Sequence, residues 1–303
     1  YKEGEFSSYI PIMNGCNNFC SYCIVPYVRG REVSRDVESI IEEVKYMDER
    51  GVKEITLLGQ NVNSYSSTYN GESVDFPKLL ELITPYMKNI LWVRFESPHP
   101  KDFSDDLIRV IRDNKKVAKH IHLPMQSGNR RILELMNRHT TRERFISLLE
   151  KMKREIPGLT LSTDVIVGFP SETEEEYLDT LSMMEIMECT EAFMYYFNPR
   201  EGTRAEKMDG QIEESVKIKR LERLINEQLE RQKRIKSASL PFETVGIVTT
   251  VTRDDQKRYL LRTEHNEYVS FSPLMPHNNG DVVYVRATEL NGNTYRGEEI
   301  EKL

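Results

Sequence analysis

Six short apolar runs with the pattern of β-strands alternate with amphipathic runs that have the period of α-helices. The expected strands cover residues 8–13, 53–60, 91–97, 120–127, 160–169 and 191–199. The expected helices cover residues 34–51, 76–87, 104–114, 130–138, 141–157, 171–188 and 213–239. Strict alternation of this kind predicts a parallel sheet with helices outside it, and six units close only part of a barrel. The predicted fold is therefore α/β, a partial (β/α)6 TIM-like barrel in residues 1–240 that ends in a long charged helix.

The pattern changes after Leu240. Short strands separated by polar turns are expected at residues 242–252, 258–264, 267–273 and 281–290. A module of this size that contains only short strands is typical of a small all-β barrel. We therefore predict a second domain in residues 241–303 with an OB-like fold.

Two expected helices carry a recognisable signal at their start. Ser104 precedes a helical pattern and is expected to cap it. In the stretch "SETEEE", Ser171 and Glu174 have the spacing of a capping box. Three leucines of the long C-terminal helix are expected to pack against the barrel: Leu221, Leu224 and Leu229.

Bulk composition argues against several classes of protein. No apolar run has the length of a membrane helix, and no basic segment precedes an apolar one as in a secretion signal. The chain carries 42 Lys and Arg against 49 Asp and Glu, and this net charge of −7 argues against a uniformly basic nucleic-acid binder. Four cysteines in a chain without a secretion signal do not indicate disulfides. We therefore expect a cytoplasmic protein with no membrane partner.

Three of the four cysteines lie close together in the stretch "GCNNFCSYC", directly after the first expected strand. Cys16, Cys20 and Cys23 are thus spaced C-x3-C-x2-C, and thiolates are soft ligands that suit zinc or an iron–sulfur cluster. A structural zinc site uses four closed ligands, and no fourth Cys or His lies nearby in the sequence. Three thiolates on a 4Fe–4S cluster leave one iron open for a substrate or cofactor. The spacing therefore favours such a cluster, with buried structural thiols as the alternative.

With Tyr22 as its aromatic residue, this motif resembles that of the radical S-adenosylmethionine (SAM) superfamily. Further segments resemble the methylthiotransferases of that superfamily, of the MiaB type. In chain order they are "VPYVRGRE", "GQNVNSY", "SPHPKDFSDDLI", "HLPMQSG", "STDVIVGFPSETEEEY" and "NPREGT". The C-terminal module resembles the TRAM domain of these enzymes, so the resemblance covers nearly the whole chain.

This resemblance implies a function. It implies a transferase that methylthiolates carbon 2 of N6-isopentenyladenosine beside the anticodon of tRNA and uses a 4Fe–4S cluster to cleave SAM. It also implies a second cluster in an N-terminal domain outside this sequence, so we expect this chain alone to cleave SAM without completing sulfur insertion. The implied partners are the isopentenylated tRNA and an electron donor such as flavodoxin or ferredoxin, and we expect a monomer.

The same resemblance gives roles to residues in the loops after the expected strands, where barrels of this kind place their chemistry. Cys16, Cys20 and Cys23 are the implied cluster ligands, and Tyr22 is implied to lie against the adenine of SAM. Further SAM contacts are expected from polar positions in or after the second, fourth and fifth strands: Gly59, Gln60, Asn61, Gln126, Ser162 and Asp164. Contacts to tRNA phosphates are expected from the arginines that follow the cysteines: Arg29, Arg31 and Arg35.

Two other functions fit part of these observations. One sister methylthiotransferase acts on threonylcarbamoyladenosine in tRNA and another on an aspartate of a ribosomal protein, although "VPYVRGRE" and "SPHPKDFSDD" favour the isopentenyl type. A non-enzymatic RNA-binding protein with a structural metal site is the alternative from another class. Iron and labile sulfide analysis distinguishes this alternative, because a zinc site contains neither.

Overall fold

The computed structural model describes residues 4–252 and 258–301. Six parallel strands match the six predicted stretches, with β1 beginning one residue earlier than predicted: β1 Ser7–Pro11, β4 Glu54–Leu58, β7 Trp92–Phe95, β8 His120–His122, β9 Thr160–Val167 and β10 Glu191–Tyr196. They pair in the orders β1-β4-β7 and β8-β9-β10, and a parallel bridge between Val93 and Val117 joins the two runs. In the described ranges β1 and β10 do not pair with each other, so the barrel is open on one side. The predicted partial barrel is confirmed.

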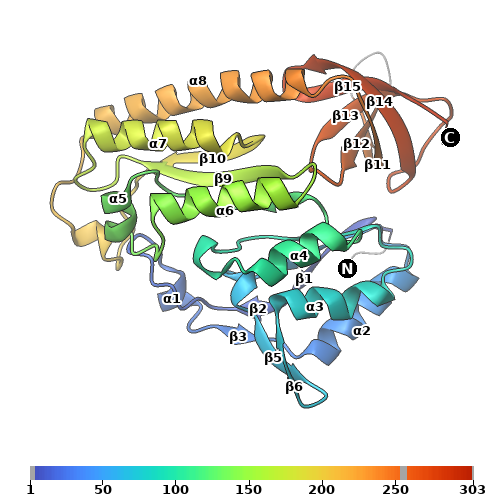
Figure 1. The fold of residues 1–303 in the computed structure, drawn as a ribbon, viewed down its shortest axis with the longest axis horizontal. Coiled ribbons are helices and arrows are strands. Elements are labelled where there is room, and N and C mark those ends of the chain that lie inside the picture. The colour runs from blue at the N-terminus through green and yellow to red at the C-terminus, as the bar shows by residue number, and fades with distance from the viewer. Residues whose placement is uncertain (1–3, 253–257, 302–303) are drawn as a thin grey trace.

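Helices cover the outer face of this barrel (Figure 1). They are α2 Val37–Glu49, α3 Phe76–Ile83, α4 Asp105–Asp113, α5 Arg130–Leu135, α6 Arg142–Glu155, α7 Glu174–Met187 and α8 Glu214–Ala238. The apolar residues of α2 recur at helical spacing and are all buried in the main core: Val37, Ile40, Ile41, Val44 and Met47. Within the described ranges, no helix has the length and apolar character needed to cross a membrane.

Several short elements were not predicted. The strand pairs are β2 Met13–Asn14 with β3 Val33–Ser34, and β5 Ser66–Tyr69 with β6 Glu72–Asp75. The short helices are α1 Val25–Val28, η1 Val62–Ser64, η2 Thr84–Tyr86, η3 Pro100–Asp102 and η4 Ala205–Lys207. Most of these elements lie in the loops that follow barrel strands, and the β5–β6 hairpin projects away from the body of the molecule (Figure 1).

A closed barrel of five strands follows α8. Its strands are β11 Phe242–Val251, β12 Tyr259–Thr263, β13 Tyr268–Ser272, β14 Val282–Asn291 and β15 Thr294–Glu299. The strand order is β11-β12-β13-β15-β14. β15, which was not among the predicted strands, runs parallel to β13 and antiparallel to β14 and so closes the barrel. The predicted small all-β module with an OB-like barrel is confirmed.

The closed barrel packs against the amino-terminal ends of the large barrel's strands. Glu54, at the start of β4, is fully buried between Arg94 of β7, at 2.5 Å, and Arg262 of β12. Arg94 also donates hydrogen bonds to the carbonyl oxygens of Thr263 and Glu264, at 2.6 and 2.9 Å. A buried charge needs partners of this kind, so Glu54 and the two arginines fix how the two barrels meet.

Further contacts extend this interface. Lys236 of α8 and Glu267 are both buried and form an ion pair at 2.6 Å. Thr160 of β9 donates a hydrogen bond to the carbonyl oxygen of His265 at 2.8 Å. An apolar cluster with members from both barrels completes the contact: Trp92, Ala118 and Ile247. The two barrels therefore pack as one body.

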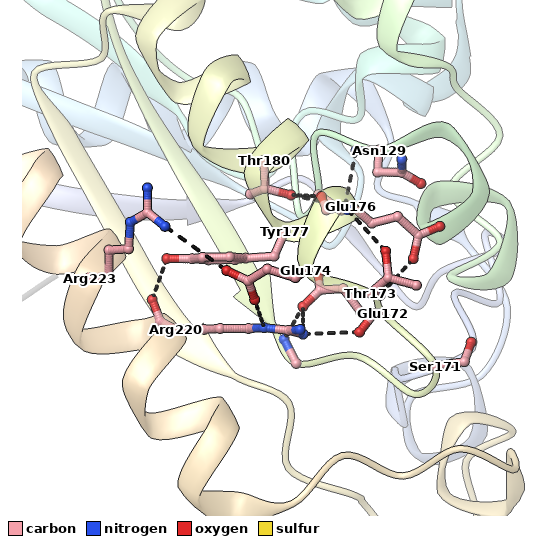
Figure 2. Close-up of polar contacts among 12 residues, drawn as sticks. Asn129, Ser171, Glu172, Thr173, Glu174, Glu176, Tyr177, Thr180, Arg220 and Arg223 are labelled. Atoms are coloured by element: carbon pink, nitrogen blue, oxygen red, sulfur yellow. Dashed lines mark hydrogen bonds and ion pairs between the residues drawn. The ribbon is translucent and has the colours of Figure 1, made fainter.

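A buried polar network ties the turn after β9 to α8 (Figure 2). The Oε2 atom of Glu172 accepts hydrogen bonds from Gly168 N at 2.7 Å and from Arg220 Nη1 at 2.9 Å. Arg220 also contacts Glu174 at 3.2 Å, and the Tyr177 hydroxyl donates to the Arg220 carbonyl oxygen at 2.8 Å (Figure 2). Burial raises the pKa of Glu172 to about 7 in spite of the arginine.

The capping box of α7 lies two residues later than predicted. Thr173 Oγ1 accepts a hydrogen bond from Glu176 N, and the Glu176 side chain accepts one from Thr173 N. Ser171, the predicted cap, has a φ of 63°, whereas an N-cap residue has extended backbone. The prediction of Ser171 with Glu174 is wrong. The stretch "SETEEE" has the spacing of the motif twice, starting at Ser171 and at Thr173, and the turn that places Glu172 against Arg220 leaves Thr173 as the N-cap.

Two other helix predictions are confirmed in whole or in part. Ser104 accepts a hydrogen bond from Leu107 N and caps α4, as predicted. In α8, Leu224 is fully buried and Leu221 packs against the main core, but Leu229 is exposed to solvent. The prediction for Leu229 is wrong because that position lies on the outer face of the helix.

Candidate active site

The three clustered cysteines lie in the loop between β2 and α1, at the carboxyl-terminal end of the barrel strands. All three are free thiols; Cys16 and Cys20 are buried and Cys23 is half-buried. Gly15 begins the loop with a φ of 77°, and a Cβ at this position would lie 2.1 Å from the carbonyl oxygen of Arg31. Only glycine therefore fits where the loop starts.

Two thiols of this loop, those of Cys16 and Cys23, sit in an environment that favours their neutral form. Burial is the main cause that raises the pKa of Cys16 and of Cys23 above the ordinary value. Metal binding displaces such protons, because the ligand form of cysteine is the thiolate. In the part of the chain that the structure describes, no three His, Cys, Asp or Glu side chains are placed to hold a single metal ion.

A cavity of about 580 Å³ opens beside the cysteine loop. Tyr22 and Cys23 line it from the loop, and Gln126 and Asp164 line it from the segments of β8 and β9. Arg200, which follows β10, adds a positive charge to the lining. The volume falls in the range of pockets that hold cofactors. The structure thus brings predicted residues from three separate segments of the chain to one cavity.

The predicted residues after β4 lie outside the lining of this cavity. A Cβ at Gly59 would lie 2.5 Å from Met13 Cγ, so the backbone here packs closely on β2. Gln60 Oε1 and Asn61 Oδ1 are buried and have no hydrogen-bond partner among the described residues, although Asn61 Nδ2 donates to Asp102 at 2.9 Å. Buried acceptors without a donor are costly, so both oxygens fit a ligand that brings N–H groups.

A chain of hydrogen bonds connects side chains of β8 and β9. Ser162 Oγ lies 3.0 Å from both His120 Nε2 and His122 Nδ1. His122 Nε2 lies 3.2 Å from Asp164 Oδ2, and His120 Nδ1 lies 2.9 Å from Thr160 Oγ1. Ser162, a predicted SAM residue, is therefore bonded within the protein, whereas Asp164 connects this chain to the cavity.

The two histidines of this chain have opposite electrostatic settings. Burial lowers the pKa of His120 to about 3, which keeps it neutral. Burial also opposes the charge on His122, but its hydrogen bond to Asp164 and the nearby Glu96 and Glu191 carboxylates together raise its pKa above the ordinary value. The carboxylates around His122 therefore favour its protonated form more than those around His120 do.

The three predicted phosphate-binding arginines differ in how free they are. Arg29 and Arg31 are exposed, and the Arg31 guanidinium lies 4.4 Å from the centre of the Phe19 ring. Arg35 Nη1 instead donates hydrogen bonds to Glu43 at 2.8 Å and to the carbonyl oxygen of Pro11 at 2.7 Å. The structure therefore leaves Arg29 and Arg31 available to a ligand and binds Arg35 into the fold.

Several residues near the site were not assigned to it from the sequence. Arg138 Nη1 lies 3.6 Å from Cys20 Sγ, although only its membership of a basic cluster stands out in the sequence. His120 and His122 alternate along an expected strand, so the sequence already indicates that both side chains lie on the same face of the sheet. Cys189 is fully buried in the main core, and burial raises its pKa to about 12.

Among solved structures, the fold is similar to that of a radical S-adenosylmethionine methyltransferase, TsrM, from Kitasatospora setae, determined with cobalamin and a 4Fe–4S cluster bound. The TM-score is 0.53 at 16% identity, over 66% of this chain and 38% of that one. This similarity concerns the fold alone. Residues 10–184 also match the family model described as the Radical SAM superfamily, and this match, together with the fold, defines the chain as a radical SAM protein.

Curated relatives narrow the family further. The chain is 43% identical over 307 aligned positions to the tRNA-2-methylthio-N(6)-dimethylallyladenosine synthase of Treponema pallidum, which covers 100% of this chain and 67% of that protein. It is 46% identical over 301 positions to the protein of the same name from Treponema denticola, with 98% and 67% covered. The chain belongs to the family of these radical SAM methylthiotransferases, and it spans about two thirds of the length of these two relatives.

Proposed function

We propose that this chain carries the catalytic core of an enzyme that methylthiolates carbon 2 of N6-isopentenyladenosine in tRNA. One observation carries the proposal: three free thiols and a cofactor-sized cavity share one end of a partial barrel, and two unpartnered buried acceptors follow a strand at that end. Relatives named for this reaction align over 100% and 98% of this chain. We assign the radical SAM core to residues 1–240 and a TRAM domain to residues 241–303.

The cysteine loop would hold one 4Fe–4S cluster through Cys16, Cys20 and Cys23. When bound, a cluster with an open iron supplies the electron that cleaves SAM to a 5′-deoxyadenosyl radical. The remaining thiol, Cys189, is fully buried away from the loop. We therefore propose one cluster in this chain and assign the supply of sulfur to a second cluster outside it.

The cavity residues, together with Gly59, Gln60 and Asn61 outside its lining, would bind and orient SAM. Tyr22 lines the cavity and would place its ring against the adenine, while Gln126 and Asp164 offer polar groups to the ribose or the carboxylate. Gln60 Oε1 and Asn61 Oδ1 would accept hydrogen bonds from the ammonium group, which would remove their unpaired state. Gly59 would allow the backbone to approach the ligand closely.

The RNA substrate would meet the same end of the barrel. A base must leave its stack to reach a cavity of this kind, and unstacked bases of RNA loops bind on aromatic side chains. Tyr195 of β10 lines the cavity and is exposed, so it offers such a surface. Arg29 and Arg31 stand exposed beside the cysteine loop and would contact phosphates.

Nucleoside mass spectrometry of tRNA from cells that lack the full-length protein tests this function. We expect loss of the 2-methylthio derivative of N6-isopentenyladenosine, retention of its precursor, and recovery with the wild-type gene but not with Cys16→Ala. Loss of the methylthio derivative of threonylcarbamoyladenosine instead would assign the sister activity. Unchanged nucleosides together with an iron-free protein would support the non-enzymatic RNA-binding alternative.

The cluster ligands have a direct test. After anaerobic reconstitution we expect about four irons per chain, because a single three-thiolate site holds one cubane. Cys16→Ala, Cys20→Ala and Cys23→Ala should each abolish the cluster absorbance and lower the iron content, whereas Cys189→Ala should retain both because that thiol is buried in the core. A cluster that survives the loss of Cys20 would contradict the ligand assignment.

The phosphate contacts have a test in the salt dependence of binding. Replacing Arg29 and Arg31 with Ala should weaken tRNA binding and flatten the plot of log affinity against log salt by about one unit of slope per lost contact. Arg35→Ala is the comparison variant, since this side chain is already bound to Glu43. An unchanged slope in the double variant would place the RNA elsewhere, whereas an equal change in Arg35→Ala would show that Arg35 also contacts a phosphate.

A further inference from the structure

The carboxyl end of α5 is joined to the cysteine loop, although more than a hundred residues separate them in sequence. Ser21 N and Ser21 Oγ donate hydrogen bonds to the carbonyl oxygens of Met136, at 3.0 Å, and Leu135, at 2.8 Å. Asn137 Nδ2 donates to the carbonyl oxygens of Asn18 and Phe19, at 3.1 and 3.0 Å. Four hydrogen bonds thus fix residues 135–137 against the loop that carries Cys20.

The backbone around Arg138 is held in an uncommon conformation. Asn137 and His139, on either side of it, both have left-handed φ values, 56° and 53°. This region is unfavourable for residues with a Cβ and persists where the surroundings over-determine it. The four hydrogen bonds supply that constraint at Asn137, and the consequence is that the Arg138 side chain turns inward.

The guanidinium of Arg138 is a buried positive charge that has no carboxylate beside it. Only 6% of Arg138 is exposed; its Nη2 donates to the Pro124 carbonyl oxygen at 2.8 Å, and its Nη1 lies 3.6 Å from Cys20 Sγ. Its Nε has no hydrogen-bond partner, and it forms no ion pair with a carboxylate in the described part of the chain. A buried charge is strongly disfavoured unless it is paired, so an opposite charge is expected at this place.

Cys20 is the group beside Arg138 that becomes negative when it binds a metal, because the ligand form of cysteine is the thiolate. A cluster with three thiolate ligands is negatively charged, and one-electron reduction adds a further negative charge.

We propose that Arg138 is a positioning residue that acts as the counter-charge of the iron–sulfur cluster and raises its reduction potential through the hydrogen bond to Cys20. The inference rests on the cluster ligands of the proposed function. A fixed positive charge stabilises the reduced cluster more than the oxidised one, and hydrogen bonds to the sulfurs act in the same direction. The electron itself comes from the external donor, so Arg138 changes how readily the cluster accepts it.

Redox titration of the reconstituted protein, followed by the EPR signal of the reduced cluster, tests the proposal. Arg138→Gln should shift the midpoint potential to a more negative value, and Arg138→Lys, which keeps the charge, should restore most of the wild-type potential. Arg130→Gln, at an exposed residue at the start of α5, should leave the potential unchanged. An unchanged potential in Arg138→Gln at full iron content would overturn the proposal and leave the ligand assignment intact.

A second measurement uses the wild-type protein and does not depend on how the variants fold. In pulsed EPR of the reduced cluster with isotopically labelled arginine, the hydrogen bond to Cys20 should give a nitrogen hyperfine coupling from the guanidinium. The absence of this coupling in a sample with full iron content would also overturn the proposal. A wild-type chain that binds no iron would instead contradict the proposed cluster ligands, so the two failures are distinguishable.

Discussion

At the scale of single residues, the polar chain of β8 and β9 shows how the barrel controls a charge beside its cavity. The Ser162 hydroxyl lies within hydrogen-bond distance of the rings of His120 and His122. Of these two rings, only that of His122 also contacts a carboxylate, that of Asp164. The two rings occupy alternate positions of one short strand, yet the pKa of His120 is lowered to about 3 and the pKa of His122 is raised above its ordinary value. Burial opposes the charge on both rings; carboxylates offset it at His122, whereas Arg94 and the other histidines oppose the charge on His120 further.

We predict that Asp164→Asn lowers the pKa of His122, because the negative charge that its hydrogen bond reaches is lost while burial remains. The folded pKa of His122 is raised, so this pair stabilises the fold below about pH 6 and the stabilisation is lost as the pH rises through that pKa. The variant should therefore lose more stability below about pH 6 than above about pH 9. Histidine NMR titration and urea unfolding at both pH values measure the two effects.

The matched control for this change is Asp106→Asn, at an exposed position on α4. It should leave the His122 titration unchanged. If His122 titrated at the same pH in wild type and in Asp164→Asn, then Asp164 would not be the group that holds the proton on the ring.

At the scale of elements, α7 shows that a capping motif needs the correct backbone conformation as well as the correct residue types. We predict that Thr173→Ala destabilises the protein by about 1 kcal/mol in urea unfolding, since it removes the acceptor for Glu176 N at the helix start. Ser171→Ala is the matched control and should cost less than about 0.5 kcal/mol, because Ser171 is exposed and does not cap the helix. A larger loss in Ser171→Ala than in Thr173→Ala would contradict this assignment.

The periodicity of the sequence predicted the six barrel strands and their helices because those elements are long and have one apolar face. The short elements were not predicted because two to four residues are too few to show a period. The β5–β6 hairpin was nevertheless predictable, since its turn is Asn70-Gly71, and both residues have the positive φ that such a turn requires. β15 was missed because its strand contains Arg296, Gly297 and two glutamates, a composition that does not indicate a strand.

The candidate site was predictable to a different extent. The cysteine spacing and the ends of the strands are visible in the letters, and Tyr22, Cys23, Gln126 and Asp164 do meet at one cavity. The inward turn of Arg138 was not visible, because it depends on hydrogen bonds between segments that are distant in sequence. The same limit applies to Arg35, whose binding to Glu43 is a property of the folded chain.

At the scale of the whole molecule, the two barrels share a buried set of charges, so we predict that their stabilities are coupled. Glu54→Ala should destabilise the protein by about 3 kcal/mol or more, because it leaves Arg94 and Arg262 without their common carboxylate. Glu243→Ala is the matched control, since its pair with Arg286 is exposed and its loss should have little effect. Urea unfolding measures both; equal effects would show that the interface charges do not couple the barrels.

This coupling also limits what a shortened chain can reveal. A chain that ended near Leu240 would lose Arg262 and the carbonyl oxygens that Arg94 binds, and it would expose part of the apolar contact around Trp92. Weak RNA binding by such a chain would report damage to the large barrel as well as the missing small one. Substitutions on the outer face of the small barrel are the better probe of its role.

The small barrel also closes one end of the large barrel. It covers the amino-terminal ends of the strands, where Arg94 and Thr160 donate hydrogen bonds to its β12–β13 turn. A molecule that enters from the cysteine end therefore cannot leave at the opposite end. A base that enters for modification must withdraw by the route it came. In the proposed reaction the modified RNA would therefore leave through the same opening that admits the next one.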